Sequence, residues 1–145
     1  MNSARDMQRQ KGPNAARILV IDDDDIAREL LSQTLVGAGY TVFSLPSAIG
    51  ATREIFQNAI DVVVVDVMLP DIDGDKLARV LRQNSRGRSL GIILVSSRPV
   101  EELRALASAA QADMVLPKSQ IRASLADMVA KTLETRGKPT LSARP

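Results

Sequence analysis

The residues of this sequence best placed to do chemistry are three aspartates that directly follow apolar runs. Residues 18–21 precede Asp22 and Asp23, and four consecutive valines at 62–65 precede Asp66. Clustered carboxylates repel one another, at about 4 kcal/mol for a pair ~4 Å apart with an effective dielectric constant of 20. They therefore take up protons or are neutralised by a cation. Since the chain has no His and no Cys, oxygen ligands favour Mg²⁺.

Two further polar side chains follow apolar runs in the same way. Ser96 comes after residues 91–95, and Lys118 comes after residues 114–117. A hydroxyl and an ammonium beside a Mg²⁺ site suit a phosphoryl group, whose equatorial oxygens the metal and Lys118 would neutralise. A carboxylate oxygen of Asp66 would then be the in-line nucleophile.

Strands that bring these residues together are predicted by the alternation of five short apolar segments with five amphipathic ones. We expect strands at 17–21, 41–45, 61–66, 91–95 and 114–117, and helices at 26–39, 46–59, 76–84, 99–110 and 120–135. This pattern is typical of an α/β fold, a doubly wound five-stranded parallel sheet with helices on both faces. The carboxyl ends of the strands then meet at one edge, beside the switch point.

Helical spacing indicates which side chains of the amphipathic segments face the core. Asp24 or Asp25 is expected to cap the first helix and Ser119 the last. The inward positions are Ile26, Leu30, Leu31, Leu35, Ala38, Ile55, Phe56, Leu77, Val80, Leu81, Val100, Leu103, Leu106, Ala107, Ile121, Leu125, Met128 and Val129.

Composition narrows the class of protein. The chain has 145 residues, 45% of them hydrophobic and 25% charged, which suits one domain. The absence of Cys excludes disulfides and thiol nucleophiles and fits a reducing compartment, and the absence of His excludes imidazole catalysis. No apolar run reaches the ~20 residues of a membrane span, and no secretory signal opens the chain. We expect flexible basic tails at 1–16 and 136–145.

Four motifs together resemble a known family. They are ILVIDD at 18–23, DVMLPDIDG at 66–74, VSS at 95–97 and LPK at 116–118. The chain resembles the receiver domain of two-component response regulators over residues 17–135. The resemblance implies a flavodoxin-like strand order of 2-1-3-4-5, and it implies a cytoplasmic signalling protein of bacterial type.

The resemblance also implies a role for each candidate residue. Asp66 would be the phosphoacceptor, and Mg²⁺ would be held by Asp22, Asp23, Asp66 and the backbone carbonyl of Met68. Ser96 would be the switch hydroxyl and Lys118 would pair with the phosphate. Such a domain promotes only its own phosphorylation and dephosphorylation and is not otherwise an enzyme.

Partners follow from the same resemblance. The phosphodonor would be a histidine kinase or a histidine phosphotransfer protein, docking on the first helix and the loop after the fifth strand. Only ten residues follow Thr135, too few for a DNA-binding module. We therefore expect a single-domain regulator that acts through an unknown protein target, on the face of the fourth helix, fifth strand and fifth helix, without binding DNA or inserting into a membrane.

Four positions depart from the family pattern or vary within it. Ser119 stands where Pro usually follows the Lys, and Val115 occupies the aromatic switch position. Ser97 stands where a small residue, often Ala, is usual. Arg98 lies where family members tune the access of water to the acyl phosphate, and its cation could bind phosphoryl oxygens or block attack.

Two other classes of protein remain open on the sequence. A degenerate receiver could act as a constitutive adaptor without phosphorylation, as the altered switch positions would permit. A phosphatase of the haloacid-dehalogenase type also uses a strand-end Asp, but it needs a second Asp where Met68 stands. A nucleotide-binding fold is disfavoured because no glycine-rich phosphate loop follows the first strand.

Overall fold

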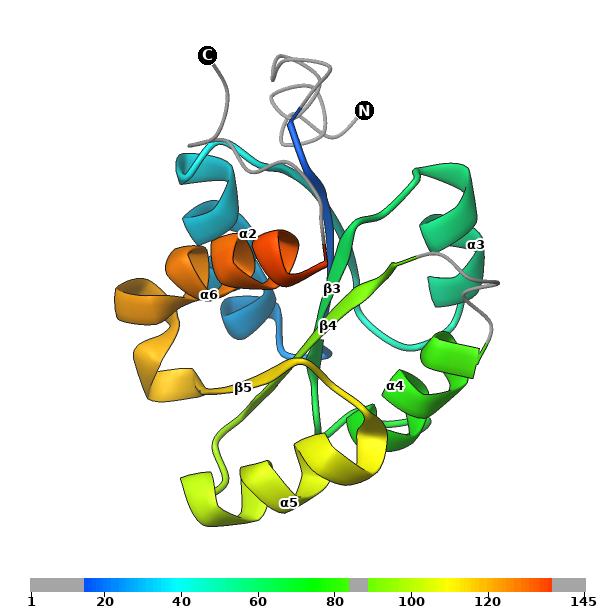
Figure 1. Ribbon diagram of the computed structural model, residues 1–145, viewed down its shortest axis with the longest axis vertical. Helices are drawn as coiled ribbons and strands as arrows, with labels where there is room; N and C mark the ends of the chain where they lie inside the picture. The colour runs from blue at the N-terminus through cyan, green and yellow to red at the C-terminus, as the bar shows by residue number, and fades with distance from the viewer. Residues whose placement is uncertain (1–14, 84–88, 137–145) are drawn as a thin grey trace.

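The computed structural model describes residues 15–83 and 89–136, which form one parallel sheet between two layers of helices (Figure 1). Five strands pair in parallel in the order β2-β1-β3-β4-β5. This confirms the expected fold class and strand order. Three residues of the proposed basic tails are described: Ala15 and Ala16 are buried, and Arg136 pairs with Asp113. The rest of both tails, residues 1–14 and 137–145, and the loop at 84–88 lie outside the described residues.

The strands and helices alternate along the chain as the sequence predicts. The strands are β1 (Arg17–Ile21), β2 (Thr41–Leu45), β3 (Val62–Asp66), β4 (Gly91–Ser96) and β5 (Met114–Pro117). The helices are α2 (Asp25–Gly37), α3 (Ala51–Gln57), α4 (Gly74–Gln83), α5 (Val100–Ala110), the short 3₁₀ helix η1 (Lys118–Gln120) and α6 (Ile121–Thr135).

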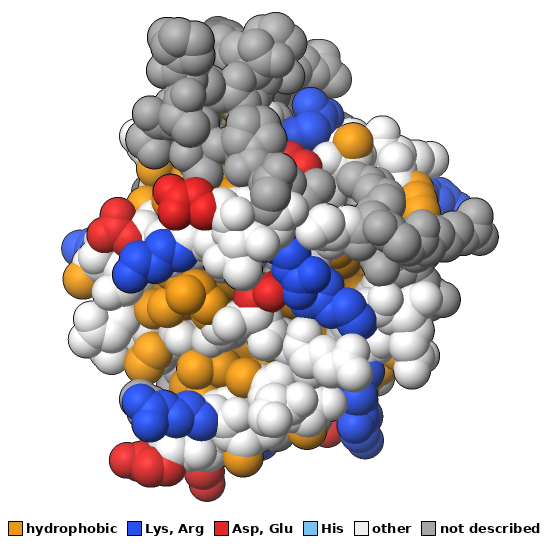
Figure 2. Space-filling model, in the orientation of Figure 1, with side chains coloured by type: hydrophobic (Ala, Val, Ile, Leu, Met, Phe, Trp, Pro, Cys, Tyr) orange, Lys and Arg blue, Asp and Glu red, His pale blue; other side chains and the backbone are white. Residues whose placement is uncertain are grey.

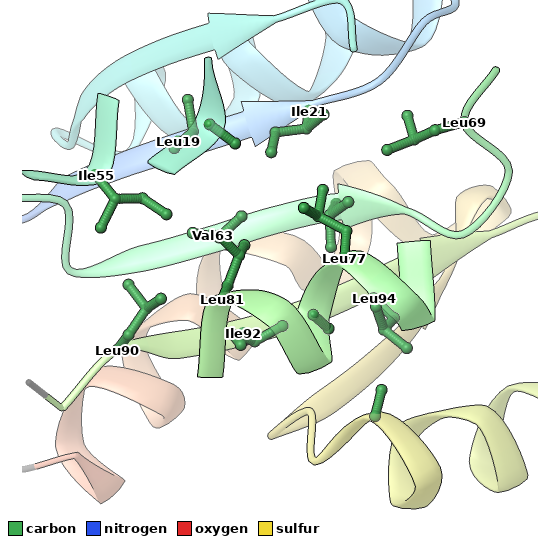
Figure 3. Close-up of a cluster of buried hydrophobic side chains, with 14 of the residues drawn as sticks. Leu19, Ile21, Ile55, Val63, Leu69, Leu77, Leu81, Leu90, Ile92 and Leu94 are labelled. Atoms are coloured by element: carbon green, nitrogen blue, oxygen red, sulfur yellow. The ribbon is translucent and has the colours of Figure 1, made fainter. Parts of the chain in front are cut away.

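Each face of the sheet has its own hydrophobic core. On one face α3, α4 and α5 cover alternate strand residues, and the side chains labelled in Figure 3 converge there, among them Ile55, Leu77 and Leu81. On the other face α2 and α6 pack side by side over the intervening strand residues. Because both faces are covered, β3 is a run of valines buried along its whole length, as a central parallel strand requires.

Four expected core positions are wrong. Ile26 is 80% exposed, and Ala38, Phe56 and Val80 are also exposed. Ala38 lies just past the end of α2, and the other three lie at the margin of an apolar stripe, where neighbours such as Ile55 and Leu81 fill the core instead. The side chains of Val100 and Leu106 lie outside the described part of the chain.

The start of the second helix and the cap of the last helix also differ from expectation. The second helix begins at Ala51 rather than Pro46, after Gly50 adopts a left-handed conformation with φ of 87°. Asp24 caps α2 as predicted, accepting a 2.7 Å bond at Oδ2 from the amide of Ala27. Ser119 does not cap the last helix, because it lies inside η1, and Gln120 precedes α6 without a side-chain cap bond.

At Gly91, α6 packs closely against the sheet. A Cβ atom placed on Gly91 would lie 2.6 Å from Cγ2 of Thr132 and 3.0 Å from Cγ2 of Val62. Both neighbours are buried and β-branched, so neither has room to turn away. We expect Gly91→Ala to lower the free energy of unfolding by about 1–3 kcal/mol, as overpacking of a close-packed core does.

The matched control for this prediction is Gly37→Ala, and urea denaturation provides the measurement. A Cβ on Gly37 would meet nothing within 4 Å, and Gly37 is the last residue of α2. We expect this variant to be unchanged or up to about 1 kcal/mol more stable, because Ala is the better helix former. Equal stability of the two variants would contradict the tight contact at Gly91.

Within the described residues, no helix has both the length and the apolar character that crossing a membrane would demand.

Candidate functional site

The candidate residues meet at the carboxyl edge of the sheet, as predicted. Asp66 is the last residue of β3 and pairs in register with Val95, and Ser96 pairs with Pro117. Asp22 follows β1 immediately, and its amide donates a 3.2 Å bond to the carbonyl of Leu45 at the end of β2. The sheet therefore fixes the backbone from which the pocket is built.

Asp22 is a fully buried carboxylate. Its Oδ1 accepts a 2.9 Å bond from the amide of Asp24, which turns the side chain back across the loop. Its Oδ2 lies 3.1 Å from Nζ of Lys118, an ion pair without the alignment of a hydrogen bond. Among the buried side-chain polar atoms of the described residues, this oxygen alone lacks a hydrogen-bond partner. It has lone pairs free for a further cation.

Asp66 is 4% exposed and is held at both oxygens. Oδ1 accepts a 3.1 Å bond from the amide of Met68, and Oδ2 accepts a 3.2 Å bond from Nζ of Lys118. Burial raises the pKa of Asp66 above its ordinary value, and the nearby Asp22 raises it further. The amide of Met68 and the ammonium of Lys118 lower the pKa without cancelling the rise.

Lys118 joins the two buried carboxylates. Its Nζ lies 3.1 Å from Oδ2 of Asp22 and 3.2 Å from Oδ2 of Asp66. Burial alone would lower the pKa of Lys118, but the two carboxylates outweigh it and raise the pKa above its ordinary value. The side chain stays 25% exposed, so its ammonium can also face a ligand that enters the pocket.

Asp23 completes a group of three acids that could hold a metal ion. One carboxylate oxygen from each of Asp22, Asp23 and Asp66 lies within 4.8 Å of the others, and Asp23 is exposed while the other two are buried. One ammonium cannot neutralise three carboxylates. The donor set is all oxygen, includes one oxygen without a hydrogen bond, and opens to solvent at Asp23, which fits Mg²⁺.

Ser96 and Arg98 border the pocket on the β4 side. Ser96 is fully buried and its Oγ accepts a 3.1 Å bond from the amide of Arg98. The guanidinium of Arg98 extends over the loop after β3, where Nη2 lies 3.2 Å from Sδ of Met68. Arg98 therefore connects the loop after β4 to the loop after β3, where the amide of Met68 bonds to Asp66. The role of the Met68 carbonyl as a ligand remains a prediction.

Sequence reasoning missed Arg28, which contacts the acidic loop. Its Nη1 donates a 2.8 Å bond to the carbonyl of Asp22, and its Nη2 lies 2.5 Å from Oδ1 of Asp25. The second contact had a sequence signal, since Asp25 and Arg28 are three positions apart on a helix. The first had none, because nothing in the spacing says that a helical side chain bonds to the end of the preceding strand.

A second missed cluster lies elsewhere on the sheet. Asp113 accepts bonds from the amide of Ile92, from Arg82 and, at 2.6 and 3.0 Å, from Arg136. Burial lowers the pKa of Arg82, and the neighbouring Arg136 adds to that effect against the pull of Asp113. The cluster connects α4, β4 and the end of α6, which is a structural role.

Residues 18–130 match the family model of the response regulator receiver domain. The chain therefore belongs to the receiver domain family of two-component response regulators, in which a pocket of acids at the sheet edge binds Mg²⁺.

Similar proteins agree with this family. The chain is 40% identical over 102 residues to the response regulator MprA of a Mycobacterium species (strain KMS), covering 70% of this chain and 44% of that protein. It is 38% identical over 104 residues to MprA of Mycobacterium ulcerans, covering 72% and 44%. The chain thus spans less than half the length of the MprA relatives it matches.

Solved structures share the fold. The response regulator TrrA of Thermotoga maritima, in complex with Mg²⁺ and BeF, has a TM-score of 0.70 at 30% identity, covering 81% of this chain and 99% of that one. A CheY-like receiver domain from Methanospirillum hungatei has a TM-score of 0.73 at 23% identity, covering 85% and 97%. These likenesses confirm the flavodoxin-like strand order.

Proposed function

We propose that the chain is a phosphoacceptor that takes a phosphoryl group onto Asp66 from a phosphohistidine in a Mg²⁺-dependent reaction. The observation that carries this proposal is the buried triangle of Asp22, Asp66 and Lys118, with Nζ of Lys118 within 3.2 Å of both carboxylates. The ammonium of Lys118 directs the Asp66 carboxylate and opposes the rise in its pKa that burial causes, which supports a nucleophilic role for this oxygen. We propose that residues 17–135 form the receiver domain that carries this site.

The chemistry is an in-line displacement at phosphorus. An oxygen of Asp66 forms the new O–P bond as the N–P bond of the phosphohistidine breaks, and the electron pair returns to the imidazole nitrogen. Lys118 pairs with a phosphoryl oxygen, and Ser96 donates its hydroxyl proton to another once it turns toward it. Water then reverses the modification, so the chain catalyses only its own phosphorylation and dephosphorylation.

The proposed metal ligands are Asp22, Asp23, Asp66 and the carbonyl of Met68. When bound, Mg²⁺ supplies charge neutralisation for the phosphoryl oxygens and for the carboxylates themselves. Oδ2 of Asp22, which lacks a hydrogen-bond partner although it pairs with Lys118, and the exposed position of Asp23 support this assignment. We propose that the exchange takes place in the cytoplasm, which the family membership supports.

Titration with Mg²⁺ and beryllofluoride tests the proposal directly. We expect NMR amide shifts at residues 22–24, 66–68 and 96–98 that require both components. The Thermotoga relative is described with Mg²⁺ and BeF, so the probe suits the family. Absence of any shift at saturating concentrations would reject the proposal and would favour the alternative, a degenerate receiver that serves as a constitutive adaptor.

The phosphodonor, a histidine kinase or a phosphotransfer protein, is proposed to dock on the first turn of α2. Ile26 is 80% exposed there, next to the acidic loop, although an isoleucine gains free energy when buried. We expect Ile26→Ser to slow phosphotransfer from the partner protein by about tenfold, the size of a moderate interface contact. Transfer rates measured with radiolabelled donor protein check this.

Two controls separate docking from chemistry in this experiment. Autophosphorylation of Ile26→Ser by acetyl phosphate should be unchanged, because a small donor needs no protein interface. Ile49→Ser removes an apolar side chain of nearly equal exposure, 77%, from the loop before α3. Equal slowing by both variants would contradict the assignment of the docking surface to α2.

The signalling surface is proposed at β5 with the helices that flank it. Figure 2 shows hydrophobic side chains gathered between α5 and α6, over β5, which is an edge strand of the sheet. Met114 and Val115 contribute partly buried apolar side chains from that strand. Val115 replaces the aromatic switch residue of the family, so a swinging ring cannot carry the signal, and an unknown protein target would read packing around β5 instead.

A further inference from the structure

The guanidinium of Arg28 is hydrogen-bonded to the peptide group between Asp22 and Asp23, two of the proposed metal ligands. Nη1 of Arg28 donates a 2.8 Å bond to the carbonyl of Asp22, and this carbonyl belongs to the peptide between Asp22 and Asp23. Nη2 of the same side chain lies 2.5 Å from Oδ1 of Asp25. The side chain is only 21% exposed, so the contact lies partly under the loop rather than on the open surface.

This peptide lies between the sheet and the helix and belongs to neither. β1 ends at Ile21, and the amide of Asp22 makes the last bond to β2. The backbone bonds of α2 begin at the carbonyl of Asp24, which accepts from the amide of Arg28. Within the described residues, the carbonyl of Asp22 therefore receives its bond from the Arg28 side chain and not from a strand or helix partner.

The direction of that carbonyl determines where Asp23 points. A peptide unit is planar, so fixing its carbonyl oxygen fixes the direction in which the chain enters the next residue. Asp23 is exposed, so packing does little to set the position of its carboxylate. Four successive aspartates repel one another and favour opening of the loop, which a single anchoring contact can oppose.

We propose that Arg28 is a positioning residue for the divalent cation, holding the Asp22–Asp23 peptide so that both carboxylates face one ion. This inference rests on the proposed function, because it assumes that the acids bind Mg²⁺. Arg28 does not touch the ion, and it acts through the backbone carbonyl of Asp22. Removing a contact that orients a metal ligand without touching the metal typically lowers metal affinity by about 10–100-fold.

A role in positioning and a role in charge balance predict opposite results for the loss of Arg28. If the guanidinium acted only as a nearby positive charge, removing it would strengthen the binding of a divalent cation. If it holds the loop, removing it must weaken binding despite the favourable change in charge. The direction of the change in Mg²⁺ affinity therefore distinguishes the two roles.

The experiment measures the Mg²⁺ dissociation constant by calorimetry for the full chain and three variants. Arg28→Met removes the guanidinium and keeps an apolar stem. Asp25→Asn removes the other partner of Arg28 but leaves the bond to the Asp22 carbonyl available, and Lys131→Met removes a positive charge from the C-terminal part of α6. We expect Arg28→Met to bind Mg²⁺ at least about tenfold more weakly, and the other two to stay within about twofold of wild type.

Mg²⁺ affinity of Arg28→Met equal to or tighter than wild type would overturn the proposal. So would weakening of the same size in Lys131→Met, since the effect would then not depend on the bond between Arg28 and the Asp22 carbonyl. Amide shifts on adding Mg²⁺ give a second readout: in Arg28→Met the shift at Asp23 should shrink more than the shift at Asp66.

Arg28→Lys covers the case in which the methionine variant fails to fold without metal. Lysine keeps the charge but cannot bond both the Asp22 carbonyl and Asp25 in the same forked geometry. We expect weakening of about threefold or more, and wild-type affinity would overturn the proposal. Failure of the wild-type chain to bind Mg²⁺ would instead reject the proposed function, so the two failures are distinguishable.

Discussion

Asp66→Asn is expected to abolish phosphorylation, whether the donor is a partner histidine protein or acetyl phosphate. The amide has nearly the shape of the carboxylate and can still accept at Oδ1 from the amide of Met68, where the wild type has a 3.1 Å bond. It lacks the charge and nucleophilicity that attack on phosphorus needs. Mass spectrometry should show the added phosphoryl group on the wild type and none on the variant.

The matched control is Asp71→Asn, which makes the same chemical change five residues later in the loop after β3. Asp71 is exposed and is not in the group of three acids that could hold a metal. We expect its phosphorylation to equal that of the wild type. A labelled Asp66→Asn protein, or an unlabelled Asp71→Asn protein, would contradict the assignment of the phosphoacceptor.

Asp66→Asn is also expected to change the pH dependence of the free energy of unfolding when EDTA removes divalent ions. The pKa of Asp66 is raised in the folded state, chiefly by burial. A carboxyl with a raised pKa contributes stability below its unfolded pKa of about 3.8 and loses that contribution as the pH rises through its folded pKa. We therefore expect Asp66→Asn to be at least as stable as wild type at pH 7, with the difference shrinking toward pH 4 in urea titrations.

Lys118→Met is expected to lower stability and the rate of phosphorylation while strengthening the binding of Mg²⁺. The substitution leaves the buried carboxylates of Asp22 and Asp66 without the ammonium that lies 3.1 and 3.2 Å from them. Without metal we expect the free energy of unfolding to fall by about 2–3 kcal/mol, less than for a fully buried pair because Lys118 is partly exposed.

Binding and reaction should change in opposite directions in this variant. Loss of a positive charge beside the acids should tighten Mg²⁺ binding by about tenfold. Phosphorylation by acetyl phosphate should slow by about 100-fold or more, because a group that pairs with the transferring phosphoryl oxygens is lost. Calorimetry and a phosphorylation time course measure the two effects.

Lys76→Met is the matched control, because it removes the same single positive charge at a position away from the two buried acids. Lys76 is exposed and makes a 3.8 Å surface pair with Asp73, of a kind that contributes little. We expect its Mg²⁺ affinity, phosphorylation rate and stability to match those of the wild type. If Lys118→Met phosphorylated at the wild-type rate, Lys118 would have a structural role only.

The sequence predicted the meeting of Asp22, Asp66 and Lys118 because each follows an apolar run. In a parallel sheet the carboxyl ends of all strands lie at the same edge, so residues that follow different strands are brought close together. The same logic placed Ser96, which is buried one residue beyond the register partner of Asp66. These predictions needed only the strand ends and the order of the strands.

Predictions that depended on side-chain packing were less accurate. Helical periodicity defines an apolar stripe but not its edges, so Ile26 and Val80 were assigned to the core although they are exposed. Ser119 was expected as a cap from its residue type alone, but the chain forms a 3₁₀ turn there. The bond between Arg28 and the carbonyl of Asp22 joins a side chain to backbone six positions earlier, and no residue pattern encodes it.

The place of β3 in the sheet has a consequence for how a signal leaves this domain. Because β3 has two strands on either side and every residue from Val62 to Asp66 is buried, we expect it to deform less than the loops at its end. A phosphoryl group on Asp66 is therefore attached to a support that should hardly move. We expect the structural change that follows phosphorylation to appear in the loops at the carboxyl edge of the sheet and at the edge strand β5. Hydrogen exchange of the Val62–Val65 amides should be the same before and after modification, while that of the loop after β4 changes.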